Sequence, residues 1–244
     1  MKPTYQDALA VYGIGGAHPG GLALTKKILK KEKLSKKSNI LDAGCGTGQT
    51  AAFLSKNYQC SVTALDKHPT MIQKAKQRFL NERLPVYAIQ GNVENLPFPD
   101  AAFDFVLSES VTTFTAIAVS LKEYCRVLKP GGVLLMTEMT AEKPLQSLQL
   151  KNIKRVYGIS NVLLEQEWID HLRRSGFSRA AAIYSNNIQS EMEKTSLPGD
   201  HYPEYQISDS VDPQLEELIY EHMKLTILYG NILGYRVYRA VRPS

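Results

Sequence analysis

Short apolar runs alternate with longer amphipathic stretches along most of the chain. The apolar runs predict strands at 39–43, 60–65, 85–90, 102–108, 132–138, 179–184 and 233–241. Between them, apolar residues at helical spacing predict helices near 21–33, 49–57, 69–81, 113–128, 165–175 and 213–229. This alternation is the βαβ pattern of a doubly wound α/β fold, a parallel sheet covered by helices on both faces. Ligands of such sheets bind beyond the carboxyl ends of the strands, so residues just after each strand are the candidates for a site.

Composition narrows the class of protein. A chain of 244 residues with 43% hydrophobic and 22% charged residues is expected to fold as a single domain, 1–244, around one core. No apolar run reaches the roughly 18 residues that span a membrane, and the N-terminus lacks the pattern of a secretory signal, so we expect a cytoplasmic protein with no membrane partner. The lysine-rich stretch 26–37 contains no aromatic residues that would stack on bases, which argues against a nucleic-acid partner. Three cysteines without C-x-x-C spacing predict neither disulfides nor a metal site.

The stretch ILDAGCGTGQTA, residues 40–51, places a glycine-rich turn between a strand and a helix, which is where phosphates or adenosine-containing ligands bind. An ATP-binding loop would require lysine and a hydroxyl residue after the last glycine, but Gln49 and Thr50 follow Gly48. GTGQTA does fit a dinucleotide fingerprint, with Asp66 at a suitable distance downstream. Asp42 weighs against it, because a carboxylate at the mouth of the strand attracts an ammonium or sulfonium ligand and repels a pyrophosphate.

Four linked segments resemble the class I S-adenosylmethionine-dependent methyltransferases, especially small-molecule enzymes similar to the ubiquinone and menaquinone methylases. They are ILDAGCGTG at 40–48, VTALDKHPTMIQKAKQRF at 62–79, IQGNVENLPFPDAAFDFVLS at 89–108 and RVLKPGG at 126–132. The resemblance implies a mostly parallel, seven-stranded Rossmann-like sheet with an antiparallel last strand. It also implies in-line transfer of a methyl group from S-adenosylmethionine to a small molecule, with S-adenosylhomocysteine as the product. The alternatives are an NAD-type oxidoreductase and a non-catalytic module that binds a cofactor or a partner.

The resemblance also implies a set of cofactor contacts. The glycines of the turn let the backbone approach the methionine and ribose, and Asp66 is expected to accept hydrogen bonds from both ribose hydroxyls. Met71 and Val93 would flank the adenine, beside Asn92, where the family often has an aspartate; the alternative role for Asn92 is in a turn. The full set comprises Tyr12, His18, Gly20, Gly21, Asp42, Gly44, Cys45, Gly46, Gly48, Asp66, Lys67, Met71, Asn92, Val93 and Ser108.

Methyl transfer needs no metal and no covalent nucleophile, but a general base can assist it. Glu109 follows the fourth strand and Glu138 ends the fifth, so both lie on the rim expected to hold the site, and His18 precedes the first strand. His171 and His201 are candidates by residue type alone. The alternatives are a helix-capping role for Glu109 and an exposed loop position for Glu138.

Segments outside the cofactor-binding core, residues 38–140, are candidates for covering the site. Residues 12–33 are expected to form a lid and a helix, with Pro19-Gly20-Gly21 at the helix N-terminus. Residues 141–164 and 187–232 are longer than a simple turn requires and are expected to cap the acceptor. Leu215, Leu218, Ile219, Met223 and Ile227 predict an amphipathic helix that either caps the site or forms a homodimer surface, so the protein is expected to be a monomer or a homodimer. The candidate walls of the acceptor pocket are Tyr157, Trp168, His201, Tyr202 and Tyr205.

Overall fold

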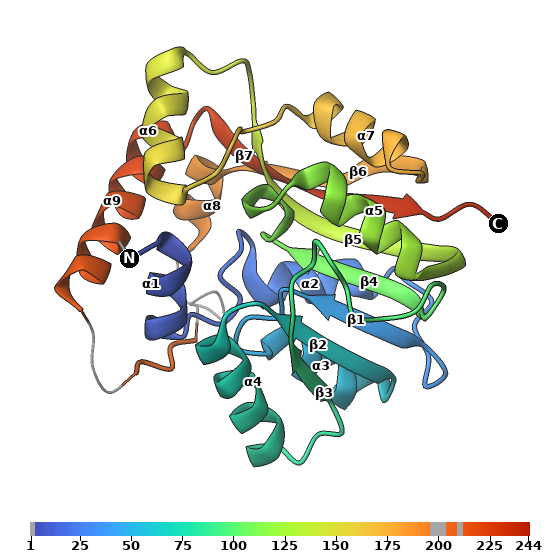
Figure 1. Ribbon diagram of the computed structural model, residues 1–244. Coiled ribbons are helices and arrows are strands. Elements are labelled where there is room, and N and C mark those ends of the chain that lie inside the picture. The colour runs from blue at the N-terminus through green and yellow to red at the C-terminus, as the bar shows by residue number, and fades with distance from the viewer. Residues whose placement is uncertain (1–2, 196–203, 209–211) are drawn as a thin grey trace.

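The computed structural model describes residues 3–195, 204–208 and 212–244, and within them seven strands form one sheet (Figure 1). The strand order is β3-β2-β1-β4-β5-β7-β6. Strands β1 to β5 pair in parallel, whereas β7 lies antiparallel between β5 and β6. The predicted α/β fold with an antiparallel last strand is therefore confirmed. The strands are β1 Asn39–Ala43, β2 Ser61–Asp66, β3 Tyr87–Gln90, β4 Phe103–Glu109, β5 Leu128–Ala141, β6 Ser178–Asn187 and β7 Leu233–Val241.

Helices cover both faces of the sheet. One face packs against α2, α3 and α4 through a buried cluster that includes Ile28, Leu54 and Phe79. The opposite face packs against α5 and α7, where Tyr124 and Trp168 are fully buried. No helix in the described part of the chain is long and apolar enough to cross a membrane. The helices are α1 Tyr5–Tyr12, α2 Gly21–Leu29, α3 Gln49–Tyr58, α4 Pro69–Asn81, the 3₁₀ helix η1 Thr112–Phe114, α5 Ile117–Val127, α6 Ser147–Tyr157, α7 Glu165–Arg174, α8 Ile188–Thr195 and α9 Pro213–Tyr229.

Local capping sets several helix boundaries. The sequence indicates Pro69 and Pro213 as first helical residues, and both begin a helix, where proline's missing N–H costs nothing. Asp212 accepts a hydrogen bond from the backbone N–H of Gln214 at 2.9 Å and so caps α9. The helix predicted at 113–128 is divided instead into η1 and α5.

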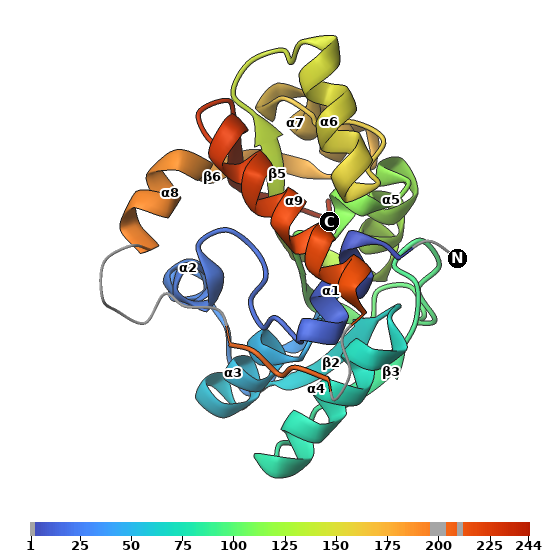
Figure 2. The ribbon, with the colours of Figure 1, turned by 90° about the vertical axis from the view of Figure 1, so that its left-hand side faces the viewer.

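A third layer, formed by α1, α6 and α9, packs against the carboxyl end of β5 and the start of β7 (Figure 2). Its centre is Tyr5, whose ring lies 5.0 Å from that of Tyr157 and 5.1 Å from that of His222. The Tyr157 hydroxyl and His222 Nδ1 are 2.7 Å apart, which links α6 to α9. Helices α1, α6 and α8 are absent from the sequence prediction. A capping box formed by Thr4 and Asp7 begins α1. This pair of residues is the feature of the sequence from which α1 could have been predicted.

The residues expected to wall an acceptor pocket do not gather in one place. Trp168 lies in the main core and donates from Nε1 to the carbonyl of Met139 at 3.0 Å. Tyr157 belongs to the third layer, and Tyr205 is more than half exposed. His201 and Tyr202 lie outside the described residues.

The predicted apolar stripe of α9 is only partly buried. Leu215 is buried, whereas Met223 is 54% exposed and Ile227 is 71% exposed. The covered side of the helix runs instead through Leu225 and Tyr229, which pack in the third layer. Part of the predicted stripe therefore faces solvent in the single chain.

Candidate functional site

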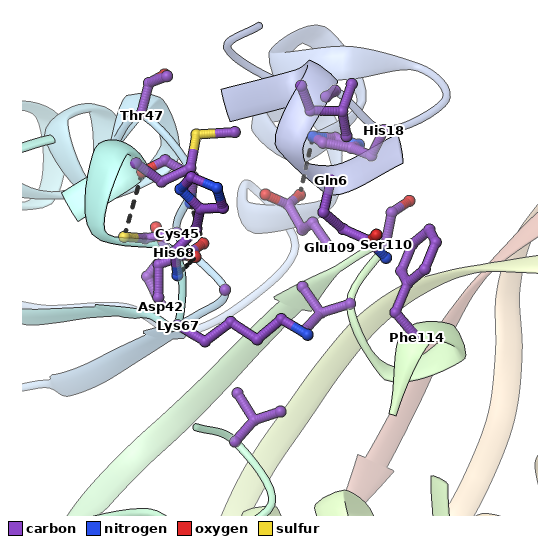
Figure 3. Close-up of a pocket in the computed structure, with 18 of the residues that line it drawn as sticks. Gln6, His18, Asp42, Cys45, Thr47, Lys67, His68, Glu109, Ser110 and Phe114 are labelled. Carbon is purple, nitrogen blue, oxygen red and sulfur yellow. Dashed lines mark hydrogen bonds and ion pairs between the residues drawn. The ribbon is translucent and has the colours of Figure 1, made fainter. Parts of the chain in front are cut away.

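A cavity opens at the carboxyl ends of β1, β2 and β4, where the glycine-rich turn meets the N-terminal segment (Figure 3). Its walls come from the turn that follows β1, from the ends of β2 and β4, and from α1 with the loop after it. Eleven predicted site residues line it: His18, Asp42, Gly44, Cys45, Gly46, Asp66, Lys67, Met71, Asn92, Val93 and Glu109. Tyr12, Gly20, Gly21, Gly48, Ser108 and Glu138 are not among its lining residues.

The glycines of the turn serve different purposes. Gly44 has a φ of +83°, and a Cβ there would lie 2.2 Å from Val111 Cγ2. Gly48 has a φ of +78°, and its Cβ would lie 2.5 Å from Phe79 Cζ. Gly46 differs, because an added Cβ would meet only the sulfur of Met71, at 4.0 Å. Gly44 and Gly48 therefore permit close packing inside the protein, whereas Gly46 leaves an open face toward the cavity.

Asp42 is a buried carboxylate at the end of β1, 2% exposed, and its Oδ2 has no hydrogen-bond partner. Burial raises the pKa of Asp42 well above its usual range, and the neighbouring negative charges of Glu109 and Asp66 raise it further. An unpaired buried carboxylate oxygen is costly unless a ligand completes its hydrogen bonding. A ligand that carries positive charge and N–H donors would supply what Asp42 lacks.

Asp66, at the end of β2, is held in a fixed orientation by the backbone. Its Oδ2 accepts from the N–H of Gly46 at 2.9 Å, and its Oδ1 accepts from the N–H of His68 at 2.8 Å. Burial raises the pKa of Asp66, while these two backbone hydrogen bonds act in the opposite direction. A carboxylate has about four lone-pair sites, so each oxygen keeps capacity for one further donor from a ligand.

The adenine side of the predicted site contains both apolar and turn residues. Met71 and Val93 are buried and line the cavity. Asn92 also lines it, but its Oδ1 accepts from the N–H of Glu94 at 3.0 Å, and its amide nitrogen donates to the Glu94 carboxylate at 3.2 Å. Asn92 therefore has the turn role that the sequence left open.

Glu109 and His18 lie side by side in the wall of the cavity (Figure 3). His18 Nε2 lies 3.5 Å from Glu109 Oε1, and both side chains are largely buried. Two threonine hydroxyls donate to the same carboxylate, Thr25 to Oε1 at 2.5 Å and Thr50 to Oε2 at 2.8 Å. The next residue, Ser110, has a φ of +57°, an uncommon conformation for a non-glycine residue that often occurs at functional sites. The arrangement fixes a carboxylate beside an imidazole at the end of β4.

Glu138 and Ser108 have internal roles. Glu138 is fully buried, and its carboxylate accepts from the backbone N–H groups of Thr112 at 2.8 Å and Thr113 at 3.1 Å. Burial raises the pKa of Glu138, and the hydrogen bonds from Thr112 and Thr113 partly offset that effect. The hydroxyl of Ser108 lies 3.2 Å from those of Thr112 and Tyr124. Neither residue lines the cavity, although Glu138 was a candidate general base. The alternative of an exposed loop position for Glu138 is wrong, because its side chain is fully buried.

Sequence reasoning missed the residues that close the cavity. Gln6 and Leu9 come from α1, and Phe114 and Thr115 come from η1 and the residue after it. The strand-and-turn pattern gives no signal for either group, because they reach the site through packing between distant segments. His171, considered by type, lies on α7, and His201 lies outside the described residues.

The comparisons with known proteins agree with this geometry. Residues 41–136 match the family described as "Methyltransferase domain". The uncharacterized methyltransferase YodH of Bacillus subtilis (strain 168) is 40% identical over 238 residues, which cover 98% of this chain and 99% of that protein. The chain belongs to the class I S-adenosylmethionine-dependent methyltransferases. As a methyltransferase it uses S-adenosylmethionine, and the NAD-type oxidoreductase and the non-catalytic module are set aside.

Solved structures show how widely this methyltransferase fold is used. Haemonchus contortus phosphoethanolamine N-methyltransferase 2, bound to phosphomonomethylethanolamine and S-adenosylhomocysteine, has a TM-score of 0.75 at 20% identity and covers 99% of this chain and 58% of that chain. The [4+2]-cyclase SpnF has a TM-score of 0.68, also at 20% identity, and covers 95% of this chain and 86% of that chain. At this level of identity the likeness concerns the fold, so the acceptor must be inferred from the methyltransferase's own site.

Proposed function

We propose that the methyltransferase transfers the methyl group to a small-molecule acceptor by in-line displacement, with Glu109 as general base. The observation that supports this most is the Glu109–His18 pair, which faces the same cavity as Asp42 and Asp66. One cavity then contains a general base, a binding site for a cationic methyl donor and the covering residues of α1.

The carboxylates of Asp42 and Asp66 define the proposed binding site of the cofactor, which we call the cofactor seat. Asp66 has one free acceptor position on each oxygen and binds the two ribose hydroxyls. The unpartnered oxygen of Asp42 faces the cationic methionine end, where an ammonium group would complete its hydrogen bonding. Gly46 leaves room for the ligand, and Met71 and Val93 cover the adenine.

The acceptor region lies between α1 and η1, where Leu9 and Phe114 supply apolar surface and Gln6 supplies an amide. Among the described lining residues, Lys67 is the one lysine or arginine, whereas Asp42, Asp66 and Glu109 are acidic. Such a lining disfavours a phosphorylated or otherwise polyanionic acceptor. We therefore propose a neutral or cationic acceptor with an apolar body. Residues 141–164 and 187–232 contribute indirectly, because α6 and α9 pack against α1 and hold it over the site.

The chemistry assigned to the chain's own residues is proton transfer and alignment. S-adenosylmethionine supplies an electrophilic methyl group on a sulfonium, whose sulfur leaves as a neutral thioether. A lone pair of the acceptor forms the new bond to that carbon while the carbon–sulfur bond breaks. Glu109 takes the proton that the acceptor loses, and His18 and the hydroxyls of Thr25 and Thr50 hold its carboxylate in position.

The test is Glu109→Gln, assayed with trideuteromethyl-labelled S-adenosylmethionine and a metabolite extract, with labelled products detected by mass. Loss of general base catalysis should lower the turnover of the product about a hundredfold or more. Binding of S-adenosylhomocysteine, measured by calorimetry, should change little. Glu167→Gln on α7 is the control, because Glu167 caps its own helix and does not line the cavity. Full turnover by Glu109→Gln would exclude Glu109 as the base, and labelled product found only on RNA or protein would exclude a small-molecule acceptor.

A further inference from the structure

Two segments far apart in sequence lie together over the cofactor turn. Residues 11–15, from the end of α1 and the loop after it, run antiparallel to residues 204–208, which we call the strap. Gly15 N–H donates to the carbonyl of Glu204 at 2.8 Å, Gln206 N–H to that of Gly13 at 3.1 Å, and Ser208 N–H to that of Val11 at 2.9 Å. The strap therefore covers the outer side of residues 11–15, and this segment leads into the cavity wall, where Ile14 and Gly16 lie.

Glu204 and Arg78 join this outer layer to the turn. Arg78 lies on α4 with a side chain only 8% exposed, and its Nε donates to the carbonyl of Thr47 at 2.9 Å. The Nη2 of the same guanidinium donates to Glu204 Oε2 at 2.8 Å. Gln49 Nε2 donates to that carboxylate oxygen as well, at 3.1 Å. One buried guanidinium therefore holds both the cofactor turn and the strap.

A second attachment lies further along α4. Lys74 Nζ donates to the carbonyl of Val11 at 3.0 Å and also to the carbonyl of Gln206. Burial lowers the pKa of Lys74. Successive turns of α4 thus place one cation on each end of the contact between the strap and residues 11–15. Two residues bonded to Arg78 and Glu204 also line the cavity: Thr47, through its carbonyl, and Gln49, through its side-chain amide. The polar contacts of the strap are therefore continuous with the cavity wall.

We propose that Arg78 and Glu204 are positioning residues that hold the strap and residues 11–15 closed over the bound cofactor. The cofactor cannot leave past Ile14 and Gly16 until the strap separates from the turn, so the Arg78–Glu204 pair governs the rate of cofactor exit. Because the strap belongs to the 187–232 segment, this pair also couples that segment to cofactor occupancy. The inference rests on the cofactor seat in the proposed function and not on the identity of the acceptor.

The test measures the dissociation rate of S-adenosylhomocysteine by stopped-flow displacement. Glu204 is 43% exposed, so its substitution leaves the core intact. Glu204→Ala should speed dissociation about three- to tenfold, the range expected on losing charge-assisted hydrogen bonds at a partly exposed pair. Glu204→Gln, which keeps an acceptor oxygen for Arg78, should restore part of the wild-type rate. The matched control is Glu82→Ala, because Glu82 is the other carboxylate beside Arg78, at 3.5 Å, and does not contact the strap.

Hydrogen exchange supplies the second readout. With S-adenosylhomocysteine bound, the amides of Gly15, Gln206 and Ser208 should exchange slowly in the wild type and in Glu82→Ala, and faster in Glu204→Ala. Unchanged dissociation and unchanged amide protection in Glu204→Ala would overturn the positioning role while leaving the cofactor seat and Glu109 untouched. The same acceleration in Glu82→Ala would overturn it too, since the effect would then reflect Arg78 in general. Failure of the wild type to bind S-adenosylhomocysteine would instead refute the cofactor seat.

Discussion

Replacing Asp66 by asparagine isolates the hydrogen bonds that we assign to the cofactor's ribose. The wild-type carboxylate already accepts the backbone N–H groups of Gly46 and His68, one on each oxygen, at 2.9 and 2.8 Å. Asparagine keeps the shape of the side chain but has one acceptor oxygen, and its NH₂ group cannot accept from either a backbone N–H or a ribose hydroxyl. The variant therefore loses at least one charge-assisted bond to the ligand, worth about 1.5–3 kcal/mol. That loss corresponds to about a ten- to hundredfold weaker binding of the cofactor.

The assay is isothermal titration calorimetry with S-adenosylhomocysteine, which binds without turning over. Asp66→Asn should also lower the unfolding midpoint, because one backbone N–H near the turn loses its acceptor, a cost of about 1–3 kcal/mol. Asp104→Asn is the matched control. Asp104 accepts from the backbone N–H of Asn39 and from Lys129, each at 2.8 Å, but it lies at the opposite end of β4 from the cavity. Unchanged affinity in Asp66→Asn, or equal weakening in Asp104→Asn, would refute the reasoning.

Three further predictions follow from the same geometry. Because the pKa of Asp42 is raised well above the usual range of a carboxyl and only its ionised form attracts a cation, affinity for S-adenosylmethionine should increase as the pH rises through that raised pKa, and Asp42→Asn should remove that dependence in calorimetric titrations. Gly48→Ala should destabilise the protein more than Gly131→Ala in urea denaturation. Both glycines have a similar positive φ, which costs an alanine about 1–2 kcal/mol, but only at Gly48 would the added Cβ also meet Phe79. Equal losses of stability in the two variants would contradict this account. Glu138→Gln should lower the free energy of unfolding by about 1–3 kcal/mol, because it weakens the hydrogen bonds from the backbone N–H groups of η1 to this side chain. A catalytic defect without any loss of stability would argue against this structural role.

The part of the cavity that we propose for the cofactor could be predicted because its residues follow strands in order along the chain. Asp42 and Asp66 end neighbouring parallel strands, so a correct sheet prediction brings them to one edge. Pro69 and Asp212 likewise act through local chemistry, and both helix starts were predicted. The same reasoning failed for Glu138, which the sequence places at the end of its strand. Strand β5 continues to Ala141, so Glu138 lies within the strand and its carboxylate is buried.

The part of the cavity that we propose for the acceptor could not be predicted, because long-range packing assembles it. Trp168 has the residue type of a pocket wall, yet its indole is buried against the sheet, and nothing in the local pattern distinguishes the two environments. Helix α1 could have been found from its capping box at Thr4 and Asp7, but not its position over the cavity, which depends on Tyr5 packing between α6 and α9. The Arg78–Glu204 pair joins residues 126 positions apart and has no sequence signature.

The placement of β7 has a consequence for how the chain is made. Among the described residues β6 pairs with β7 alone, and the outer edge of β5 is also covered by β7, which spans Leu233–Val241. While a ribosome is still synthesising residues before 233, β5 presents unpaired backbone groups at an open edge, and β6 has no strand beside it. Such edges pair readily with other extended chains. The five parallel strands can therefore pair before β7 is made, but β5 and β6 stay without their shared partner until residues 233–241 emerge, and a chaperone that shields the β5 edge during that interval would increase the yield of native protein.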